Sequence, residues 1–197
     1  MNWYNKTNRL RICYKILSVF ISVLIGIFAM LFLLSSLMKN KVYPLKHKES
    51  VICYAKNYNL EESLVFAIIK VESNFNSKAI SKKGAQGLMQ IKSQTAEFIG
   101  KNLSINEFDL FKPETNINFG CYYFRYLINK FNNIDTALCA YNAGEGTIRK
   151  WLENPSYSPD GFTLKEIPYK ETKNYLIKIK SAKHKYEKLY PKLLTKL

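Results

Sequence analysis

The stretch LEESLVFAIIKVES, residues 60–73, decides the fold class. Its apolar residues recur at steps of four and three, which predicts one face of a helix from about Glu61 to Glu72: Leu64, Ile68 and Val71. Glu72 lies one turn beyond Ile68, so its carboxyl group should lie at the edge of the core, near the negative end of the helix dipole. Burial and the dipole both disfavour the ionised form, and we therefore expect a raised pKa for Glu72, as a general acid requires.

The rest of the chain after residue 50 also shows helical periodicity, without the period-two alternation of strands. A short helix is predicted over 93–100, with Ser93 as its cap and Gly100 as its stop. Longer helices are predicted to begin at Pro113, to cover 133–144, and to follow Pro168 as a basic helix. The domain is therefore expected to be all-α, or nearly so.

No residue from Ile16 to Met38 is charged, and this run is long enough to cross a hydrocarbon core of about 30 Å. A cleaved signal peptide is the alternative, but its apolar region should be shorter and end in an A-x-A-like pattern, so the length favours an uncleaved anchor. The expected organisation is a short N-terminal segment (1–15), a transmembrane anchor (16–38), a basic linker (39–49) and a folded domain (50–197).

The formal net charge is +15, with lysines spread along the chain and concentrated after residue 164. This spread favours anionic neighbours such as lipid headgroups or acidic cell-wall polymers, whereas a nucleic-acid binder would interleave arginines with stacking aromatics. The four cysteines, at positions 13, 53, 121 and 139, show no metal-ligand spacing, and nothing indicates a metal or nucleotide cofactor. We therefore expect buried free thiols, and a disulfide between Cys121 and Cys139 remains an alternative.

Two further stretches combine glycines with polar and aromatic residues. In SKKGAQGLMQI, residues 81–91, the glycines permit a tight turn and Gln90 is the polar residue among apolar neighbours. In AYNAGEG, residues 140–146, Tyr141 and Asn142 stand at a helix end. Sugars are commonly held by aromatic faces, amides and hydroxyls, although a structural turn and a core tyrosine are the alternative interpretations.

Together, five motifs in order resemble the soluble lytic transglycosylase (SLT) domain, a mostly helical, lysozyme-like fold, over about residues 50–185. They are ES at 72–73, GAQGLMQI at 84–91, NINFG at 116–120, AYNAG at 140–144 and IPYKETKNYL at 167–176. Two departures are Lys173, where an arginine is common, and the absence of a proline after the asparagine of NFN.

The resemblance implies that Glu72 is the single catalytic acid and base. It also implies a set of substrate-binding residues: Ser73, Ser81, Gln90, Tyr141, Asn142, Glu171 and Tyr175, with Tyr175 close to Glu72 and Glu171 as a positioning acid. The implied substrate is peptidoglycan, cut at the β-1,4 bond between N-acetylmuramic acid and N-acetylglucosamine with formation of a 1,6-anhydro ring. A muramidase of the same fold and a non-catalytic peptidoglycan-binding module are the alternatives.

The implied partners are peptidoglycan glycan strands and a membrane that holds the N-terminal helix. Basic residues flank the span on both sides, so the charge distribution does not set its orientation. Because peptidoglycan lies outside the membrane, we expect a cytoplasmic N-terminus and an extracytoplasmic domain. The Lys-rich final helix would then contact anionic lipid or wall polymer, or serve as a solubilising surface.

Overall fold

In the computed structural model the backbone is described for residues 2–191 and the side chains for residues 14–191. Over this range the chain forms helices and turns, and its β pairing is limited to two isolated bridges, Ile80–Gln86 and Gln86–Ile91. The predicted all-α class is therefore confirmed. The chain divides into two compact units, Met1–Pro44 and Leu45–Leu197.

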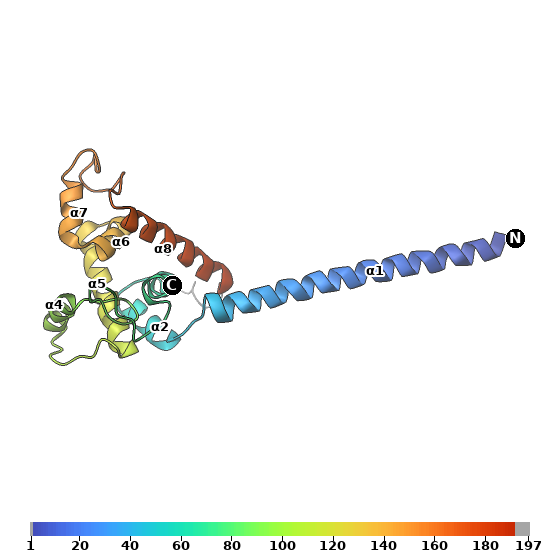
Figure 1. Ribbon diagram of the computed structural model, residues 1–197, viewed down its shortest axis with the longest axis horizontal. Coiled ribbons are helices and arrows are strands. Elements are labelled where there is room, and N and C mark those ends of the chain that lie inside the picture. The colour runs from blue at the N-terminus through green and yellow to red at the C-terminus, as the bar shows by residue number, and fades with distance from the viewer. Residues whose placement is uncertain (1, 192–197) are drawn as a thin grey trace. The chain divides into compact units, whose positions relative to one another are not determined.

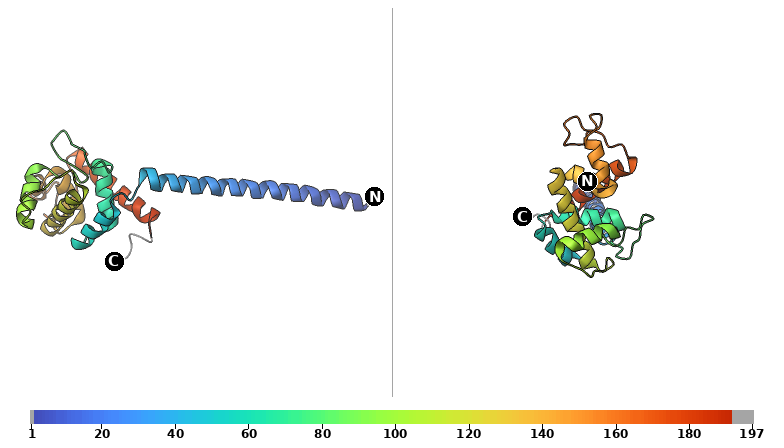
Figure 2. Two further views of the ribbon diagram at one scale, coloured as in Figure 1. Left: turned by 90° about the horizontal axis from the view of Figure 1, so that it is seen from below. Right: turned by 90° about the vertical axis from the view of Figure 1, so that its left-hand side faces the viewer.

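The first unit is one long helix, α1 (Asn2–Leu37), continued by a short π-helix, η1 (Met38–Val42) (Figure 2). The large apolar side chains of α1 are exposed from Tyr14 onward. By length and composition, the segment Tyr14–Val42 is able to cross a membrane, and it contains the predicted span.

The second unit is built around α3 (Glu62–Ser73), in which every residue from 62 to 69 is buried. A helix buried on all sides lies at the centre of a domain, so the one-sided burial predicted for this helix is wrong. The long helix α8 (Lys170–Leu189) packs along α3. The other helices of this unit are α2 (Lys48–Asn57), α4 (Ser93–Leu103), α5 (Pro113–Phe131), α6 (Ile134–Ala143) and α7 (Glu145–Leu152) (Figure 1).

Both predicted ends of α4 are wrong. Lys92 is the N-cap residue, and Ser93 is already the first helical residue. The helix continues through Gly100 and ends at Leu103, where Ser104 takes the left-handed conformation. Gly100 has a packing role, because a Cβ there would lie 2.7 Å from the carbonyl oxygen of Ile105.

Two helices of the second unit were not predicted, α2 and α7. Each buries only two residues, Val51 and Ala55 in α2 and Ile148 and Trp151 in α7. So few apolar positions leave no clear period in the sequence. The expected linker 39–49 is also shorter than predicted, because η1 covers its start and α2 begins at Lys48.

The cysteines whose side chains are described are free thiols. Cys121 and Cys139 are buried, whereas Cys53 is exposed. The preference for buried free thiols is thus confirmed at two positions and wrong at Cys53, and Cys121 and Cys139 form no bridge. The side chain of Cys13 lies outside the described residues.

Candidate active site

Glu72 lies in the last turn of α3, where the helix ends because Asn74 takes a left-handed conformation with φ of 51°. The side chain is partly buried. The pKa of Glu72 is raised from its usual 4.5 to about 7. Burial is the largest cause, the Tyr175 hydroxyl acts in the opposite direction, and the negative charge of Glu171 contributes to the increase. The predicted raised pKa is confirmed, with burial as its largest cause.

Two tyrosines face this carboxyl group from other helices. Tyr175 of α8 is 6% exposed, and its hydroxyl, although close enough to influence the pKa of Glu72, makes no hydrogen bond of normal geometry with the described residues. The Tyr141 hydroxyl of α6 donates to the carbonyl oxygen of Met89 at 2.8 Å. Burial raises the pKa of both phenols well above 10. Both therefore stay neutral, and Tyr175, whose hydroxyl proton has no other acceptor among the described residues, can act as a hydrogen-bond donor beside Glu72.

The loop before α4 is held by its own polar side chains. The Ser81 hydroxyl accepts hydrogen bonds from the amides of Ala85, at 3.0 Å, and Lys83, at 3.3 Å. Gln90 has a positive φ of 50°, and its side-chain amide nitrogen donates to the carbonyl oxygen of Gly87 at 2.8 Å. These contacts give Ser81 and Gln90 a structural role in the loop, and sugar binding by either residue stays a prediction.

Asn116 of α5 connects this loop to the core, a role that the sequence analysis missed. It is fully buried, and its side-chain oxygen accepts a hydrogen bond from the Met89 amide at 2.7 Å. Its amide nitrogen donates to the carbonyl oxygens of Gln86, at 2.9 Å, and Leu110, at 2.8 Å. Three backbone groups of two separate loops are thus satisfied by one side chain. The available signal was a polar residue inside the apolar pattern of NINFG.

Two motif glycines are required by close packing around Asn116. Gly87 has a φ of +76°, and a Cβ there would overlap the Asn116 side chain and the carbonyl oxygen of Leu110. At Gly120, one turn along α5, a Cβ would lie 2.7 Å from the Cβ of Met89. Close approach of α5 to the loop therefore sets the position of Met89, to which Tyr141 is bonded.

The remaining predicted site residues, Ser73, Asn142 and Glu171, each contact another residue. The Ser73 hydroxyl donates to the carbonyl oxygen of Ile69 at 3.2 Å. Asn142 accepts a hydrogen bond from the Thr172 hydroxyl at 2.8 Å, which joins the end of α6 to the start of α8. Glu171 is 73% exposed and lies 3.8 Å from the ammonium group of Lys83. Within the described residues, Glu171 is the one carboxylate whose charge contributes to the pKa of Glu72.

The arrangement thus provides one partly buried carboxylic acid with a pKa of about 7, with two neutral phenols beside it. Such an acid can give a proton to a leaving group and then accept one as a carboxylate. Residues 14–191 contain no group of three or more metal-ligating side chains.

Residues 49–160 match the model of the family described as the transglycosylase SLT domain. The chain is 39% identical to the soluble lytic murein transglycosylase of Salmonella typhimurium over 140 residues, which cover 68% of this chain and 22% of that protein. It is 31% identical to the membrane-bound lytic murein transglycosylase C of Yersinia pestis over 175 residues, which cover 76% of this chain and 47% of that protein.

Among solved structures, the second unit is similar to the 70 kDa soluble lytic transglycosylase of Escherichia coli, with a TM-score of 0.67 at 33% identity. It is also similar to an inactive glutamate-to-glutamine mutant of the lytic transglycosylase Slt of Pseudomonas aeruginosa, with a TM-score of 0.66 at 34% identity. These matches cover 78% and 74% of this chain but only 26% and 24% of the solved chains. The chain therefore spans less than half the length of these relatives.

Proposed function

The chain belongs to the transglycosylase SLT domain family, and from this membership we propose that its second unit is a peptidoglycan lytic transglycosylase. It would cleave the β-1,4 bond between N-acetylmuramic acid and N-acetylglucosamine in the course of cell-wall remodelling. The observation that carries the proposal is the carboxyl group of Glu72, whose pKa is raised to about 7 by burial.

In the first step, protonated Glu72 would donate its proton to the glycosidic oxygen as the bond to C1 of the muramyl residue breaks. The leaving N-acetylglucosamine hydroxyl takes that proton, and positive charge develops on the muramyl ring. Glu72 becomes a carboxylate, which Tyr175 would orient as a neutral donor. A pKa near 7 suits this step, because a useful fraction of the acid is protonated at neutral pH.

In the second step, the Glu72 carboxylate would take the proton from the C6 hydroxyl of the same muramyl residue while O6 bonds to C1. The ring closes as a 1,6-anhydro product, and water is not consumed. This sequence needs one carboxyl group, whereas most glycosidases use two. The exposed position of Glu171 supports a positioning role for it, and Ser73, Ser81, Gln90 and Asn142 remain our proposed substrate contacts.

We further propose that α1 anchors the protein as a single span, with a cytoplasmic N-terminus and an extracytoplasmic second unit. One described helix has the length and composition of a span, and one relative is membrane-bound by name, which together indicate membrane association. The basic helix α8 would contact anionic lipid or wall polymer through its exposed lysines. Lys180 and Lys183 do not contribute to that surface, because they pair with Asp135 and Glu61.

Mass spectrometry of muropeptides released from purified peptidoglycan by the full chain in detergent tests the proposal. We expect products lighter by one water than reducing-end species. Reducing-end products would instead identify a muramidase of the same fold. Binding to peptidoglycan without release of either product would identify a non-catalytic binding module.

The pH dependence of cleavage gives a second prediction. Because Glu72 must be protonated in the free enzyme, kcat/KM should be highest below pH 7 and should fall about tenfold per pH unit above it. The measurement is kcat/KM between pH 5 and pH 9, with thermal unfolding followed over the same range to separate inactivation from unfolding. A value of kcat/KM that stays constant up to pH 9 would contradict the acid role of Glu72.

A further inference from the structure

A buried hydroxyl group joins the last turn of α6 to the first turn of α8. Thr172, the third residue of α8, is 1% exposed, and its hydroxyl donates to the side-chain oxygen of Asn142 at 2.8 Å. Among the described residues, this hydroxyl has no other hydrogen-bond acceptor. Because a buried hydroxyl proton without an acceptor is unfavourable, the contact with Asn142 should persist in the folded protein.

This contact decides which way round the Asn142 side chain is held. A carboxamide has an accepting oxygen at one end and a nitrogen with two donors at the other. Since the proton of Thr172 can be accepted only by the oxygen, the nitrogen is turned away from Thr172. Within residues 14–191 the nitrogen has no acceptor, and it is not among the buried atoms that lack a partner, so a ligand can reach it.

The contact lies one turn of α8 away from the tyrosine beside Glu72. Thr172 and Tyr175 are both buried and stand three positions apart, so they share a face of α8. The Tyr175 hydroxyl is close enough to Glu72 to influence its pKa. On α6, Asn142 follows Tyr141, whose pKa is raised in part by the charge of Glu72. Thr172 and Asn142 therefore join the two helices that bring tyrosines to Glu72.

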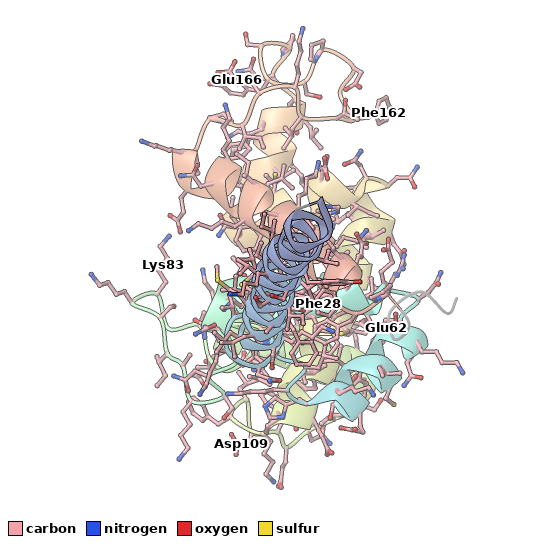
Figure 3. The ribbon with its side chains drawn as sticks, turned by 90° about the vertical axis from the view of Figure 1, so that its right-hand side faces the viewer. Phe28, Glu62, Lys83, Asp109, Phe162 and Glu166 are labelled. Atoms are coloured by element: carbon pink, nitrogen blue, oxygen red, sulfur yellow. The ribbon has the colours of Figure 1, made fainter. Side chains whose placement is uncertain are left out.

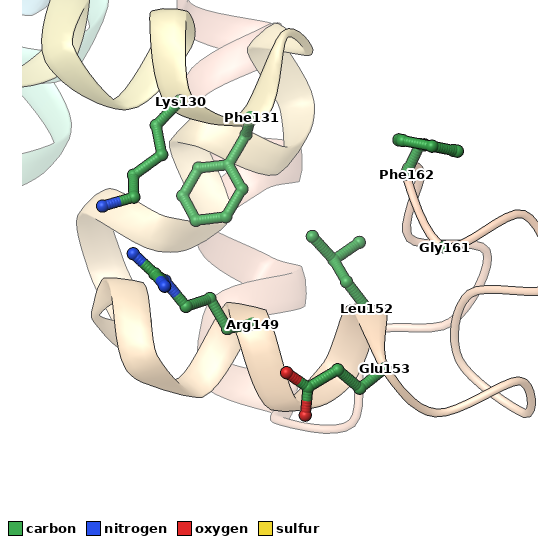
Figure 4. Close-up of a pocket in the computed structure, with 7 residues that line it drawn as sticks. All are labelled: Lys130, Phe131, Arg149, Leu152, Glu153, Gly161 and Phe162. Carbon is green, nitrogen blue, oxygen red and sulfur yellow. The ribbon is translucent and has the colours of Figure 1, made fainter.

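Another polar cluster of this unit already has its charges paired. Lys130 and Arg149 point toward one another in the pocket of Figure 4, because both pair with Glu145 at 2.6 Å. Figure 3 shows Phe162, part of this pocket, away from Lys83, which pairs with the second residue of α8. The cluster thus lies apart from the start of α8, and its cations have partners that the Asn142 nitrogen lacks.

We propose that Thr172 is a positioning residue, which holds the Asn142 amide so that its nitrogen donates a hydrogen bond to an accepting oxygen of the glycan. This inference rests on the proposed function and deepens it, because it gives one proposed substrate contact a donor role and names the residue that fixes it. Amide carbonyl oxygens are good acceptors, and both sugars of the glycan carry an acetamido group. A donor that is held in place before binding also loses less conformational entropy when the glycan binds.

The test is Thr172→Val in the full chain in detergent, with soluble peptidoglycan fragments as substrate. Valine keeps the branched shape but lacks the hydroxyl, so the Asn142 amide is free to turn and present its oxygen. We expect KM to rise about threefold to tenfold, the value of one hydrogen bond, with kcat within about twofold of the wild type. Thr172→Ser restores the hydroxyl and should bring KM back to within about twofold. A lower unfolding temperature with an unchanged KM would show a structural role only and overturn the proposal.

Two comparisons separate positioning from a general effect of removing a buried hydroxyl. Thr136→Val changes a threonine that is also 1% exposed and also third in its helix, α6, and it should alter neither KM nor kcat. In the Asn142→Ala background, Thr172→Val should raise KM no further, because it acts only through the Asn142 amide. Additive increases in KM from these two substitutions, or an equal increase from Thr136→Val, would contradict the positioning role.

A binding measurement separates this inference from the proposed function. Titration calorimetry with a soluble tetrasaccharide of the glycan uses the Glu72→Gln background, so that bound sugar is not cleaved. Kd should rise about threefold to tenfold when Thr172→Val is added, and less than about twofold when Thr172→Ser is added. If the wild type releases no muropeptides, the proposed function fails and this titration alone decides the inference. A Kd unchanged by Thr172→Val, or no tetrasaccharide binding at millimolar concentration, would overturn it.

Discussion

The full chain carrying Glu72→Gln is expected to release 1,6-anhydromuropeptides at least about 10³-fold more slowly than the wild type. Glutamine keeps the shape of Glu72 and can still donate a hydrogen bond, but it can neither give a proton to the glycosidic oxygen nor take one from the C6 hydroxyl. Both proposed steps are lost together, so this is the largest expected effect on activity. The measurement is the rate of muropeptide release from purified peptidoglycan, quantified by mass spectrometry.

A loss of activity in this variant has to be distinguished from a loss of the fold, and the raised pKa of Glu72 allows this distinction. The pKa of Glu72 in the folded state is about 7, above its usual 4.5, so folding becomes less favourable as the pH rises from about 4.5 to 7 and the buried group ionises. Glu72→Gln removes that cost. The variant should therefore unfold at the same temperature as the wild type at pH 4 and at a higher temperature at pH 8. At pH 8 its free energy of unfolding should exceed that of the wild type by at most about 3 kcal/mol.

The matched control for this variant is Glu97→Gln, because Glu97 is exposed on α4. It should retain the activity and the thermal stability of the wild type at both pH values. An active Glu72→Gln enzyme would refute the proposed role of Glu72. An inactive variant that is destabilised at pH 8 would leave loss of structure as the cause and would count against the buried, protonated state of the side chain.

The Asn116→Ala variant is expected to have the largest effect on stability, a loss of about 3–5 kcal/mol in free energy of unfolding. Asn116 is fully buried, and its removal leaves the Met89 amide and the Leu110 carbonyl oxygen without the partner that it supplies. The Gln86 carbonyl oxygen also loses a hydrogen bond but keeps the one from the Ile91 amide at 3.0 Å. Each buried group without a partner costs about 1–3 kcal/mol. For a unit of this size the unfolding temperature should fall by about 10 °C or more.

Thermal unfolding of the full chain in detergent measures this effect, and Asn129→Ala is its control. Asn129 is an exposed residue of the same helix, so the same substitution there should cost less than about 0.5 kcal/mol. Activity measured well below the unfolding temperature should also fall in Asn116→Ala, because the loop that carries Met89 and Gln90 is no longer tied to α5. An unfolding temperature equal to that of the wild type would contradict the role of Asn116.

Much of the fold was accessible from local patterns. The helix that ends at Glu72 was predicted to within one residue of its observed bounds, because apolar spacing and the terminal polar cluster lie within the helix itself. The start of α5 at Pro113 was also predicted, because proline is favoured in the first turn of a helix. By contrast, α2 and α7 bury two residues each, too few for a helical period to show in the sequence.

The sequence by itself determined the helical class, the apolar N-terminal helix and the position of the one acid at the end of the central helix, because each depends on residues a few positions apart. The tertiary structure alone decided which groups surround that acid. Tyr175 of α8, Tyr141 of α6 and the loop held by Asn116 converge there from segments up to about a hundred residues apart. The pKa of Glu72 depends on burial and on distances between such segments, which no local pattern contains.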